Sequence, residues 1–339
     1  MATITTFGEL MLRLRTPGFS RFAQSTSLEA SFGGGEANVA VSLAQLGHEA
    51  RWVSVVPENA IGEWALGTLR GLGVNTTHVR RGGERLGIYF LEAGASQRAS
   101  QVVYDRAGSA VSSLAPGAIA WDEALRGATW FHTTGISPAL SDSCAKVTRE
   151  ALVAARQAGA TTSVDLNFRK KLWSKAKAKE VMTGLMAHTD VLIANEEDCD
   201  SVFDIRAGAV ESGSLDHSRY VEVAKTVLAR FPALKRVAIT LRESKSASEN
   251  GWSALLTDRD GHAFSHHYDV TVVDRVGAGD SFAAGLIHAL LEGRERQAAV
   301  DFATAASALK HTIPGDFNLV SLAEIEALAR GDGSGRVQR

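Results

Sequence analysis

The chain has 339 residues, with 36 lysines and arginines against 38 aspartates and glutamates, and a formal net charge of −2. This balance gives no reason to expect a nucleic acid or an anionic membrane as a partner. The two cysteines, Cys144 and Cys199, form no CxxC pattern, which argues against a disulfide scaffold or a structural zinc site. No apolar run reaches about 18 residues and the N-terminus has no signal-peptide pattern, so we expect a cytoplasmic protein without a membrane partner.

Strand-like and helix-like segments alternate over most of the chain. Runs of β-branched and apolar residues predict strands, whereas apolar residues at helical spacing predict helices, with Gly47 and Gly73 at two helix ends. The expected strands lie at 3–9, 50–56, 128–135, 161–168, 190–198 and 236–241, and the expected helices at 36–47, 61–73, 141–160 and 221–231. This alternation predicts an α/β fold in which a mostly parallel sheet is sandwiched by helices.

Two stretches, at about 12–32 and 85–108, interrupt the alternation. The first contains a Pro-Gly turn, and the second is typical of two strands joined by a Gly/Ser turn. Two arrangements are equally open: a small separate sheet that covers a ligand cleft as a lid, or an extension of the main sheet at its edge. Either way, residues 1–330 form one domain that carries these insertions, and the Gly-rich residues 331–339 are expected to be a flexible tail.

A strand, a small-residue turn and a helix follow one another in VVDRVGAGDSFAAGL, residues 272–286. The first N–H groups of a helix carry partial positive charge, and Gly277, Ala278 and Gly279 let a phosphate approach them closely. The turn is neither a Walker loop nor a dinucleotide-binding GxGxxG. Asp280 is then either the N-cap of the helix or a catalytic base that works beside a phosphate.

A second glycine cluster, SFGGGEAN at 31–38, precedes a helix. Gly33, Gly34 and Gly35 permit close backbone approach, and Asn38 falls in the first helical turn, where its amide suits the hydroxyls of a sugar-like ligand. The alternative is a flexible hinge between lid and core.

GGGEANVAVSLAQLG and VVDRVGAGDSFAAG together resemble the paired signatures of the ribokinase-like (PfkB-type) carbohydrate kinases, in the right order and separation. The resemblance extends from residue 8 to residue 318. It implies a ribokinase-like α/β core with a small β-sheet lid, and ATP-dependent phosphorylation of a sugar hydroxyl with Mg²⁺. It makes Asp280 the expected general base and the turn 277–279 the expected anion hole. It also places Asp274 near a monovalent cation such as K⁺; the alternative for Asp274 is a turn cap at the strand end.

Within the family, the stretches GIYFLE, VVYDRAGSA, DLNFRKKLW and HTIPGDFN are most similar to 2-keto-3-deoxygluconate kinases. The expected reaction is transfer of the γ-phosphate to the terminal (C6) hydroxyl of 2-keto-3-deoxygluconate. Two arginines would bind its carboxylate through charge-assisted hydrogen bonds. Taken singly and without the resemblance, Arg106 and Arg169 are better interpreted as exposed salt-bridge partners, and Tyr89 and Tyr104 as part of the lid core. The expected sugar-acid contacts are Gly34, Gly35, Asn38, Tyr89, Tyr104, Arg106, Arg169, Asp280 and Asp316.

The same resemblance also implies which residues contact the nucleotide. Asn195 begins a segment similar to the family's Asn-x-x-Glu motif, but Asp198 stands in the fourth position, which leaves it a water-mediated magnesium role. The remaining nucleotide contacts are expected from Asn167, Thr240 and Arg242, with the turn 277–279. A polar loop at 242–251 replaces the usual Gly-rich one, so the nucleotide preference is open.

Three alternatives remain beside this hypothesis. One is a fructokinase or another sugar kinase of the family, and another is a catalytically silent sugar- or nucleotide-binding regulator on the same fold. A dehydrogenase is disfavoured by the glycine spacing. The sequence does not give the stereochemistry at C4 of the substrate, so the gluconate and galactonate derivatives both remain candidates. Exposed lid strands would also allow a homo-oligomer that pairs through the lid sheet.

Overall fold

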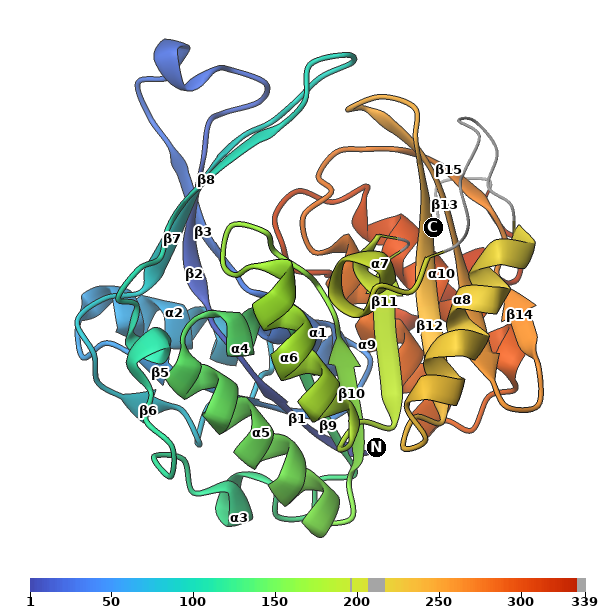
Figure 1. The fold of residues 1–339 in the computed structure, drawn as a ribbon. Helices are drawn as coiled ribbons and strands as arrows, with labels where there is room; N and C mark the ends of the chain where they lie inside the picture. The colour runs from blue at the N-terminus through green and yellow to red at the C-terminus, as the bar shows by residue number, and fades with distance from the viewer. Residues whose placement is uncertain (196, 207–216, 334–339) are drawn as a thin grey trace.

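A nine-stranded sheet forms the centre of the protein in the computed structural model, which describes residues 1–195, 197–206 and 217–333 (Figure 1). The strands lie in the order β14–β13–β12–β11–β10–β9–β1–β4, and β15 pairs with β13. The parallel strands are β4 (Glu49–Val53), β1 (Thr3–Phe7), β9 (Trp130–Thr134), β10 (Thr161–Asp165), β11 (Val191–Asn195) and β12 (Arg236–Ser244). The antiparallel end comprises β13 (Glu249–Asp258), β14 (His262–Phe264) and β15 (Tyr268–Thr271). The predicted mostly parallel sheet is therefore confirmed.

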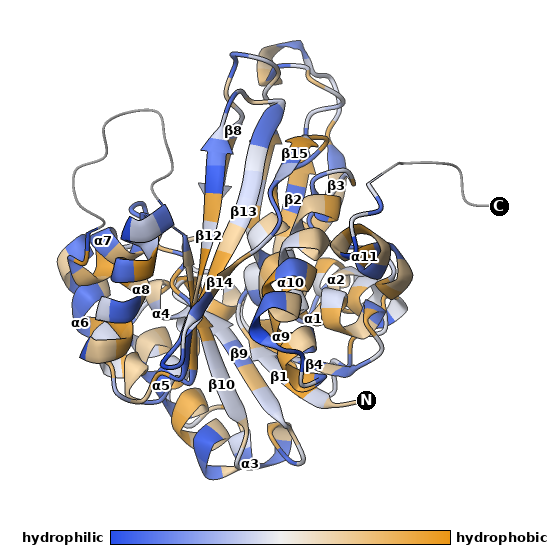
Figure 2. Ribbon diagram, turned by 90° about the vertical axis from the view of Figure 1, so that its right-hand side faces the viewer, coloured by the Kyte–Doolittle hydropathy of each residue, from blue (hydrophilic) through white to orange (hydrophobic). Residues whose placement is uncertain are grey.

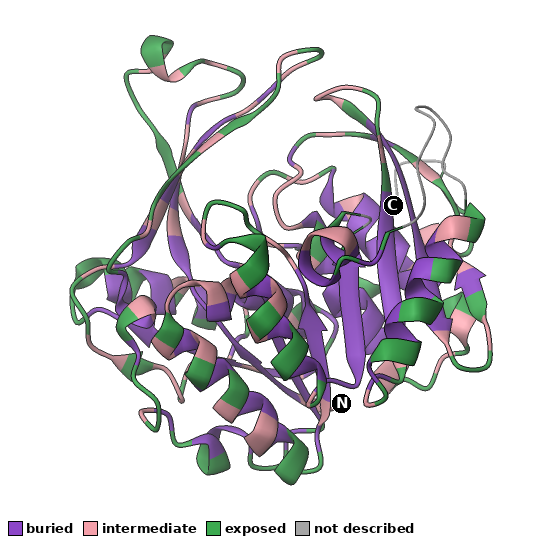
Figure 3. Ribbon diagram, viewed as in Figure 1, coloured by how far each residue is buried: buried purple, intermediate pink, exposed green. Residues whose placement is uncertain are grey.

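Helices cover both faces of this sheet, as Figure 2 shows. One layer contains α1 (Gly35–Gln45), α2 (Ala60–Gly71), α9 (Ala278–Leu291), α10 (Arg296–Lys310) and α11 (Leu322–Ala329). The other contains α3 (Trp121–Ala124), α4 (Ile136–Ala139), α5 (Asp142–Gln157), α6 (Lys175–Met186), α7 (Asp198–Phe203) and α8 (His217–Arg230). The central strands are buried on both sides (Figure 3). They contain buried threonines and serines beside their apolar residues, such as Thr5 on β1 and Thr162 and Ser163 on β10. No described helix combines the length and apolar character needed to cross a membrane.

Four strands form a second, separate sheet in the order β3–β2–β7–β8. They are β2 (Met11–Arg15), β3 (Glu29–Gly33), β7 (Gly87–Glu92) and β8 (Gln101–Asp105). We call this sheet the lid. It rises away from the core in Figure 1, so the two interrupting stretches do not extend the main sheet, and that alternative is wrong. The short helices η1 (Phe22–Gln24) and η2 (Ala110–Ser113) lie in the connections that flank these strands.

Two segments differ from the sequence prediction. The strand expected at 50–56 is split, because β5 (Val55–Val56) leaves the main sheet and pairs with β6 (Arg80–Arg81). The segment 242–251 is not a loop, because β12 continues to Ser244 and β13 returns antiparallel from Glu249. The main-chain N–H and C=O groups of the two strands hydrogen-bond to each other there, so a segment with polar side chains can form a hairpin. Of the expected tail at 331–339, residues 334–339 lie outside the described part of the chain.

Candidate active site

A cleft of about 360 Å³ lies between the lid and the carboxyl ends of the parallel strands, where α/β sheets commonly bind ligands. Of the candidate site residues that the sequence analysis singled out, Asp274 and Gly33 do not line it. Those that line it are Gly34, Gly35, Asn38, Tyr89, Tyr104, Arg106, Asn167, Arg169, Asn195, Asp198, Thr240, Arg242, Gly277, Ala278, Gly279, Asp280 and Asp316.

The turn before α9 opens onto this cleft. Gly277 is the N-cap residue, with a left-handed φ of 84°, and a Cβ atom there would lie 2.0 Å from the main-chain oxygen of Asp316. Only glycine suits both conditions. Asp280 is the third residue of the helix, and its interpretation as the N-cap is wrong. The N–H groups of the first helical turn have no intrahelical acceptor and can bind an anion.

The carboxylate of Asp280 is partly buried and contacts α1. Its Oδ2 accepts a hydrogen bond of 2.7 Å from Nδ2 of Asn38. Burial raises the pKa of Asp280 to about 7, although the Asn38 hydrogen bond opposes this increase. A carboxylate that exchanges its proton near neutral pH suits general-base chemistry.

The glycines at 33–35 bring the α1 turn close to two carboxylates. A Cβ atom at Gly33 would lie 1.9 Å from Oδ2 of Asp316, and one at Gly35 would lie 3.5 Å from Oδ1 of Asp280. Gly34 N–H donates to Oδ1 of Asn38 at 3.2 Å. Close approach therefore explains these glycines without a hinge.

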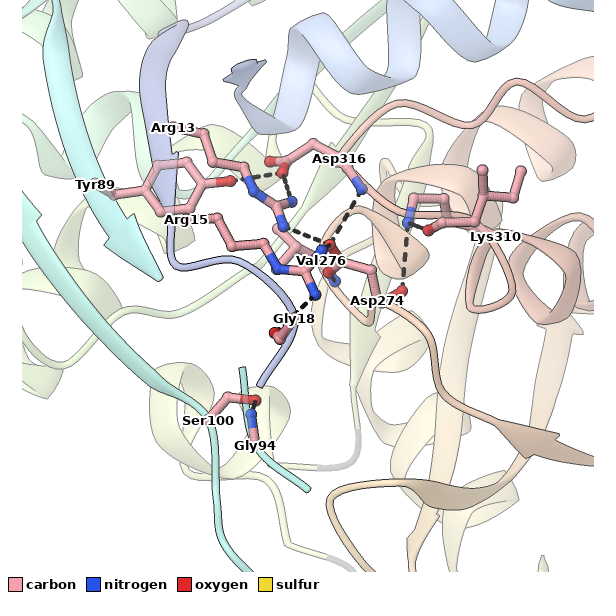
Figure 4. Close-up of polar contacts among 12 residues, drawn as sticks. Arg13, Arg15, Gly18, Tyr89, Gly94, Ser100, Asp274, Val276, Lys310 and Asp316 are labelled. Carbon is pink, nitrogen blue, oxygen red and sulfur yellow. Dashed lines mark hydrogen bonds and ion pairs between the residues drawn. The ribbon is translucent and has the colours of Figure 1, made fainter. Parts of the chain in front are cut away.

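Asp316 is the centre of a buried ion cluster (Figure 4). Its Oδ1 accepts hydrogen bonds from the Tyr89 hydroxyl, at 2.5 Å, and from Nη1 of Arg13. Arg13 uses its other terminal nitrogen for an ion pair with Asp274. Burial raises the pKa of Asp316, and burial also holds the pKa of Tyr89 well above its usual range. The sequence analysis missed Arg13, although its position on β2 is two residues after the inward-facing Met11.

Asp274 lies behind the cleft with its oxygens already engaged. Oδ1 accepts from the N–H of Val276 and Oδ2 from the N–H of Gly315, both at 3.1 Å, and Oδ2 also pairs with Arg13. The main-chain oxygen of Asp274 accepts from Nζ of Lys310 at 3.3 Å. These contacts fit the turn-cap interpretation. They do not fit the expected K⁺ site, because each oxygen of Asp274 already accepts a hydrogen bond from the protein.

The two expected carboxylate-binding arginines differ in their surroundings. Arg106 forms an ion pair with Glu9, whose other oxygen accepts from the Ser109 hydroxyl, and its guanidinium lies 5.6 Å from the centre of the Tyr104 ring. Arg169 is exposed, and across the described residues no carboxylate lies within ion-pair distance of it. The sequence analysis missed Glu9, a buried acid directly after β1.

Two buried acids lie near the carboxyl ends of the neighbouring strands β10 and β11 and line the cleft. Asp165 ends β10 and Asp198 begins α7 after β11. Burial raises the pKa of Asp165 well above its usual range and that of Asp198 to about 6. A divalent cation nearby would stabilise both charged carboxylates. Oδ1 and Oδ2 of Asp198 already accept the N–H groups of Phe168 and Asn195, at 3.3 and 3.4 Å, so Asp198 fits a cation held through water. Asn195 uses its Oδ1 to accept the N–H groups of Glu197 and Asp198, each at 2.9 Å.

The β12–β13 hairpin adds cleft residues that the sequence analysis did not identify. Asn250 and Trp252 line the cleft beside Arg242, as do Arg275 and His311 from later segments. The amide oxygen and nitrogen of Asn250 are buried and have no hydrogen-bond partner among the described residues. Asn250 and Trp252 were missed because the segment at 242–251 was interpreted as a loop, whereas in β13 they are alternating residues that share one face.

Comparison with known proteins agrees with this architecture. A crystal structure of 2-dehydro-3-deoxygluconokinase from Thermotoga maritima has 48% sequence identity and a TM-score of 0.93, and the match covers 97% of this chain and 98% of that one. The 2-dehydro-3-deoxygalactonokinase of Haloferax volcanii is 34% identical over 98% of both chains. The 2-dehydro-3-deoxygluconokinase of Bacillus subtilis is 30% identical over 92% of this chain and 90% of its own.

More distant structures share the fold, as the putative ribokinase II of Escherichia coli does with a TM-score of 0.78 at 19% identity. The family model described as pfkB family carbohydrate kinase matches residues 1–319. The chain therefore belongs to the pfkB family of carbohydrate kinases.

Proposed function

We propose that the protein transfers the γ-phosphate of ATP to the C6 hydroxyl of 2-keto-3-deoxygluconate, with Asp280 as general base. The observation that carries this proposal is the position of Asp280. Its carboxylate, with a pKa of about 7, lies in the first turn of α9, where the N–H groups face the same cleft. A base and an anion-binding turn are thus adjacent, as phosphoryl transfer to a hydroxyl requires.

The reaction is a single displacement. Asp280 takes the proton of the C6 hydroxyl while the hydroxyl oxygen forms a bond to the γ-phosphorus. The bond from that phosphorus to the bridging oxygen breaks, and ADP leaves with the electron pair. The main-chain N–H groups at 277–279 hold the oxygens of the transferring phosphoryl group, where charge develops.

A magnesium ion would be held by Asp165 and Asp198, directly or through water. Its chemistry is to neutralise the phosphate charge of ATP. The residues proposed to contact the nucleotide line the same cleft and are Thr240, Arg242, Asn167 and Asn195. Asn250, with its unpartnered amide, would also contact the nucleotide.

Two arginines, Arg106 and Arg169, line the cleft and can contact an anionic substrate. Arg169 has no protein carboxylate as a partner among the described residues and is available for the carboxylate of a sugar acid. Arg106, held by Glu9, lies beside Tyr104, which offers a ring face and a hydroxyl. The names of the Thermotoga and Haloferax relatives support a 2-keto-3-deoxy sugar acid and leave gluconate and galactonate as two candidates.

A substrate panel tests this proposal. ADP release is measured with 2-keto-3-deoxygluconate, 2-keto-3-deoxygalactonate, fructose and ribose, each with ATP and with GTP. We expect kcat/KM for a sugar acid to exceed that for fructose at least about a hundredfold, because fructose lacks the carboxylate that the two arginines would bind. A preference for fructose would contradict the substrate assignment, and no turnover with any pair would favour a silent regulator.

We also propose a homo-oligomer that pairs through the lid. β8 is an outer strand of the lid sheet, and Val103 and Tyr104 on it are 52% and 42% exposed. An exposed edge with apolar side chains favours pairing with a second copy. Light scattering should give a multiple of the chain mass that falls toward the monomer in Val103→Lys, but not in the exposed control Thr77→Lys. A monomeric parent protein would contradict this proposal.

A further inference from the structure

Lys310, the last residue of α10, has a completely buried side chain. Its Nζ donates to the main-chain oxygen of Asp274 at 3.3 Å and to that of Ile313 at 3.2 Å (Figure 4). Across the described residues it forms no ion pair with a carboxylate. A buried ammonium whose protein acceptors are main-chain carbonyls is unusual, because lysines are rarely fully buried without a paired acid.

Main-chain carbonyls are also the ligands that replace the hydration shell of K⁺ in proteins. The resemblance to the family places a monovalent cation at Asp274. In this chain the Asp274 carbonyl accepts from the Lys310 ammonium. Oδ1 of Asp274 accepts from the N–H of Val276, and Oδ2 accepts from Arg13 and from the N–H of Gly315. The local positive charge is therefore supplied by the protein.

The two carbonyls belong to the segments that build the active site. One lies in 272–276, directly before the anion-binding turn, and the other in 311–316, which ends at Asp316. The segments are joined by a hydrogen bond of 2.8 Å from Val273 N–H to the oxygen of His311. They touch again where Gly277 packs against the main chain of Asp316. A cation bound to both segments fixes the turn relative to Asp316.

We propose that the Lys310 ammonium acts as a built-in monovalent cation, which holds the anion-binding turn in place and makes the enzyme independent of K⁺. This inference rests on the proposed function, because the turn is assigned there to phosphate binding. Lys310 is a positioning residue, since it acts on the phosphate through the 274–279 main chain and does not line the cleft.

The first test uses the unchanged protein. kcat/KM for ATP is measured at saturating Mg²⁺ and equal ionic strength in KCl, NaCl and tetramethylammonium chloride. We expect the three values to agree within about twofold. Activation by K⁺ of about fivefold or more would overturn the proposal.

The second test removes the ammonium. Lys310→Ala should lose roughly a hundredfold in kcat in tetramethylammonium chloride, because a small displacement of positioning groups has effects of that size. KCl should restore at least about tenfold of this loss, since K⁺ can occupy the space beside the carbonyls, and Na⁺ should restore less. Lys310→Met fills the same space without charge, so K⁺ should not restore it. A folded Lys310→Ala enzyme with equal activity in all three salts would overturn the proposal.

A third measurement is independent of the substrate. The melting temperature of Lys310→Ala without ligands should be higher in KCl than in tetramethylammonium chloride, because a cation that binds only the folded state stabilises it. The parent protein and the surface variant Lys225→Ala should show no such difference. If no sugar is phosphorylated by the parent protein, the proposed function fails, whereas this melting test still decides whether Lys310 replaces the cation. Equal melting of Lys310→Ala in both salts counts against the replacement.

Discussion

Asn38 donates a hydrogen bond of 2.7 Å from its Nδ2 to Oδ2 of Asp280, across 242 positions of the chain. The bond joins the first turn of α1 to the first turn of α9. Because Asn38 donates, it stabilises the charged carboxylate and limits the increase in pKa that burial causes. Asn38, which the sequence predicts as a sugar contact, thus also favours the charged form of the proposed base.

Replacing the base tests its role directly. Asp280→Asn keeps the shape of the side chain and removes its basicity, so kcat should fall by about 10²–10⁴, the range of general-base catalysis. The dissociation constant for ATP, from calorimetry, should stay nearly unchanged. The exposed Asp122→Asn serves as the control. Near-normal turnover in Asp280→Asn would refute the assignment.

The pH dependence should follow the raised pKa of Asp280. Catalysis needs the deprotonated carboxylate, so kcat/KM should rise with pH through a midpoint near 7 and reach a plateau above it. Asn38→Leu removes the donor that favours the charged form, and its midpoint should move to higher pH. A rate profile between pH 5 and 9 measures both, and a midpoint near pH 4 in the parent enzyme would contradict the assignment.

The same pKa predicts a change in stability. A carboxyl whose pKa is about 7 when folded and about 4 when unfolded favours the folded state at low pH, and this contribution is lost as pH rises through 7. Asp280→Asn cannot ionise. Its melting temperature relative to the parent should therefore increase from pH 4 to pH 7 and then level off. Calorimetric scans at pH 4, 6 and 8 check this, and a difference that does not change with pH would contradict it.

Substrate charge should be recognised by Arg169. Arg169→Ala should raise KM for the sugar acid by about tenfold or more, since a charge-assisted hydrogen bond contributes ~1.5–3 kcal/mol. Turnover of fructose, however slow, should be unaffected, and the neighbouring exposed Lys170→Ala should behave like the parent. Steady-state kinetics with both sugars separates these outcomes. An equal loss for both sugars would indicate a structural role for Arg169.

The buried cluster around Arg13 should be essential for folding. Arg13→Met leaves Asp274 and Asp316 buried without their guanidinium partner, which should cost about 3–5 kcal/mol in the free energy of unfolding. Urea denaturation measures the loss. Adding Asp274→Asn should recover part of it, whereas the exposed lid variant Arg21→Met should unfold like the parent. A loss below about 1 kcal/mol would show that Arg13 is dispensable.

Local patterns in the sequence explain why the sheet and most cleft residues could be predicted. Strand ends and glycine turns are short-range signals, and in a parallel sheet the strand ends meet at one edge. The ion pairs could not be predicted in this way. Arg13 and Asp274 are 261 positions apart, and Arg106 and Glu9 are 97 apart. Nothing in LRLR shows which arginine becomes buried until the register of β2 is known.

The prediction that Asp280 is the N-cap of α9 was wrong for a different reason. Aspartate at a helix start favours the N-cap, but a left-handed glycine already occupies that position at Gly277. Asp280 is left with a side chain that faces the cleft. The roles expected for the site residues, from Asp280 to Arg169, remain predictions for the experiments above.

Arg13 on β2 and Tyr89 on β7 are register partners in the lid, and both hold Asp316 of the core. The lid is therefore attached to the core at this point, through Asp316 and, by the second ion pair of Arg13, through Asp274. Any closing movement has to bend the strands beyond this point, so the outer ends of the lid travel while Tyr89 stays in place. If Tyr89 and Asp316 bind the substrate as proposed, this part of the site would keep the same geometry during such a movement, and the substrate could be recognised before the lid closes.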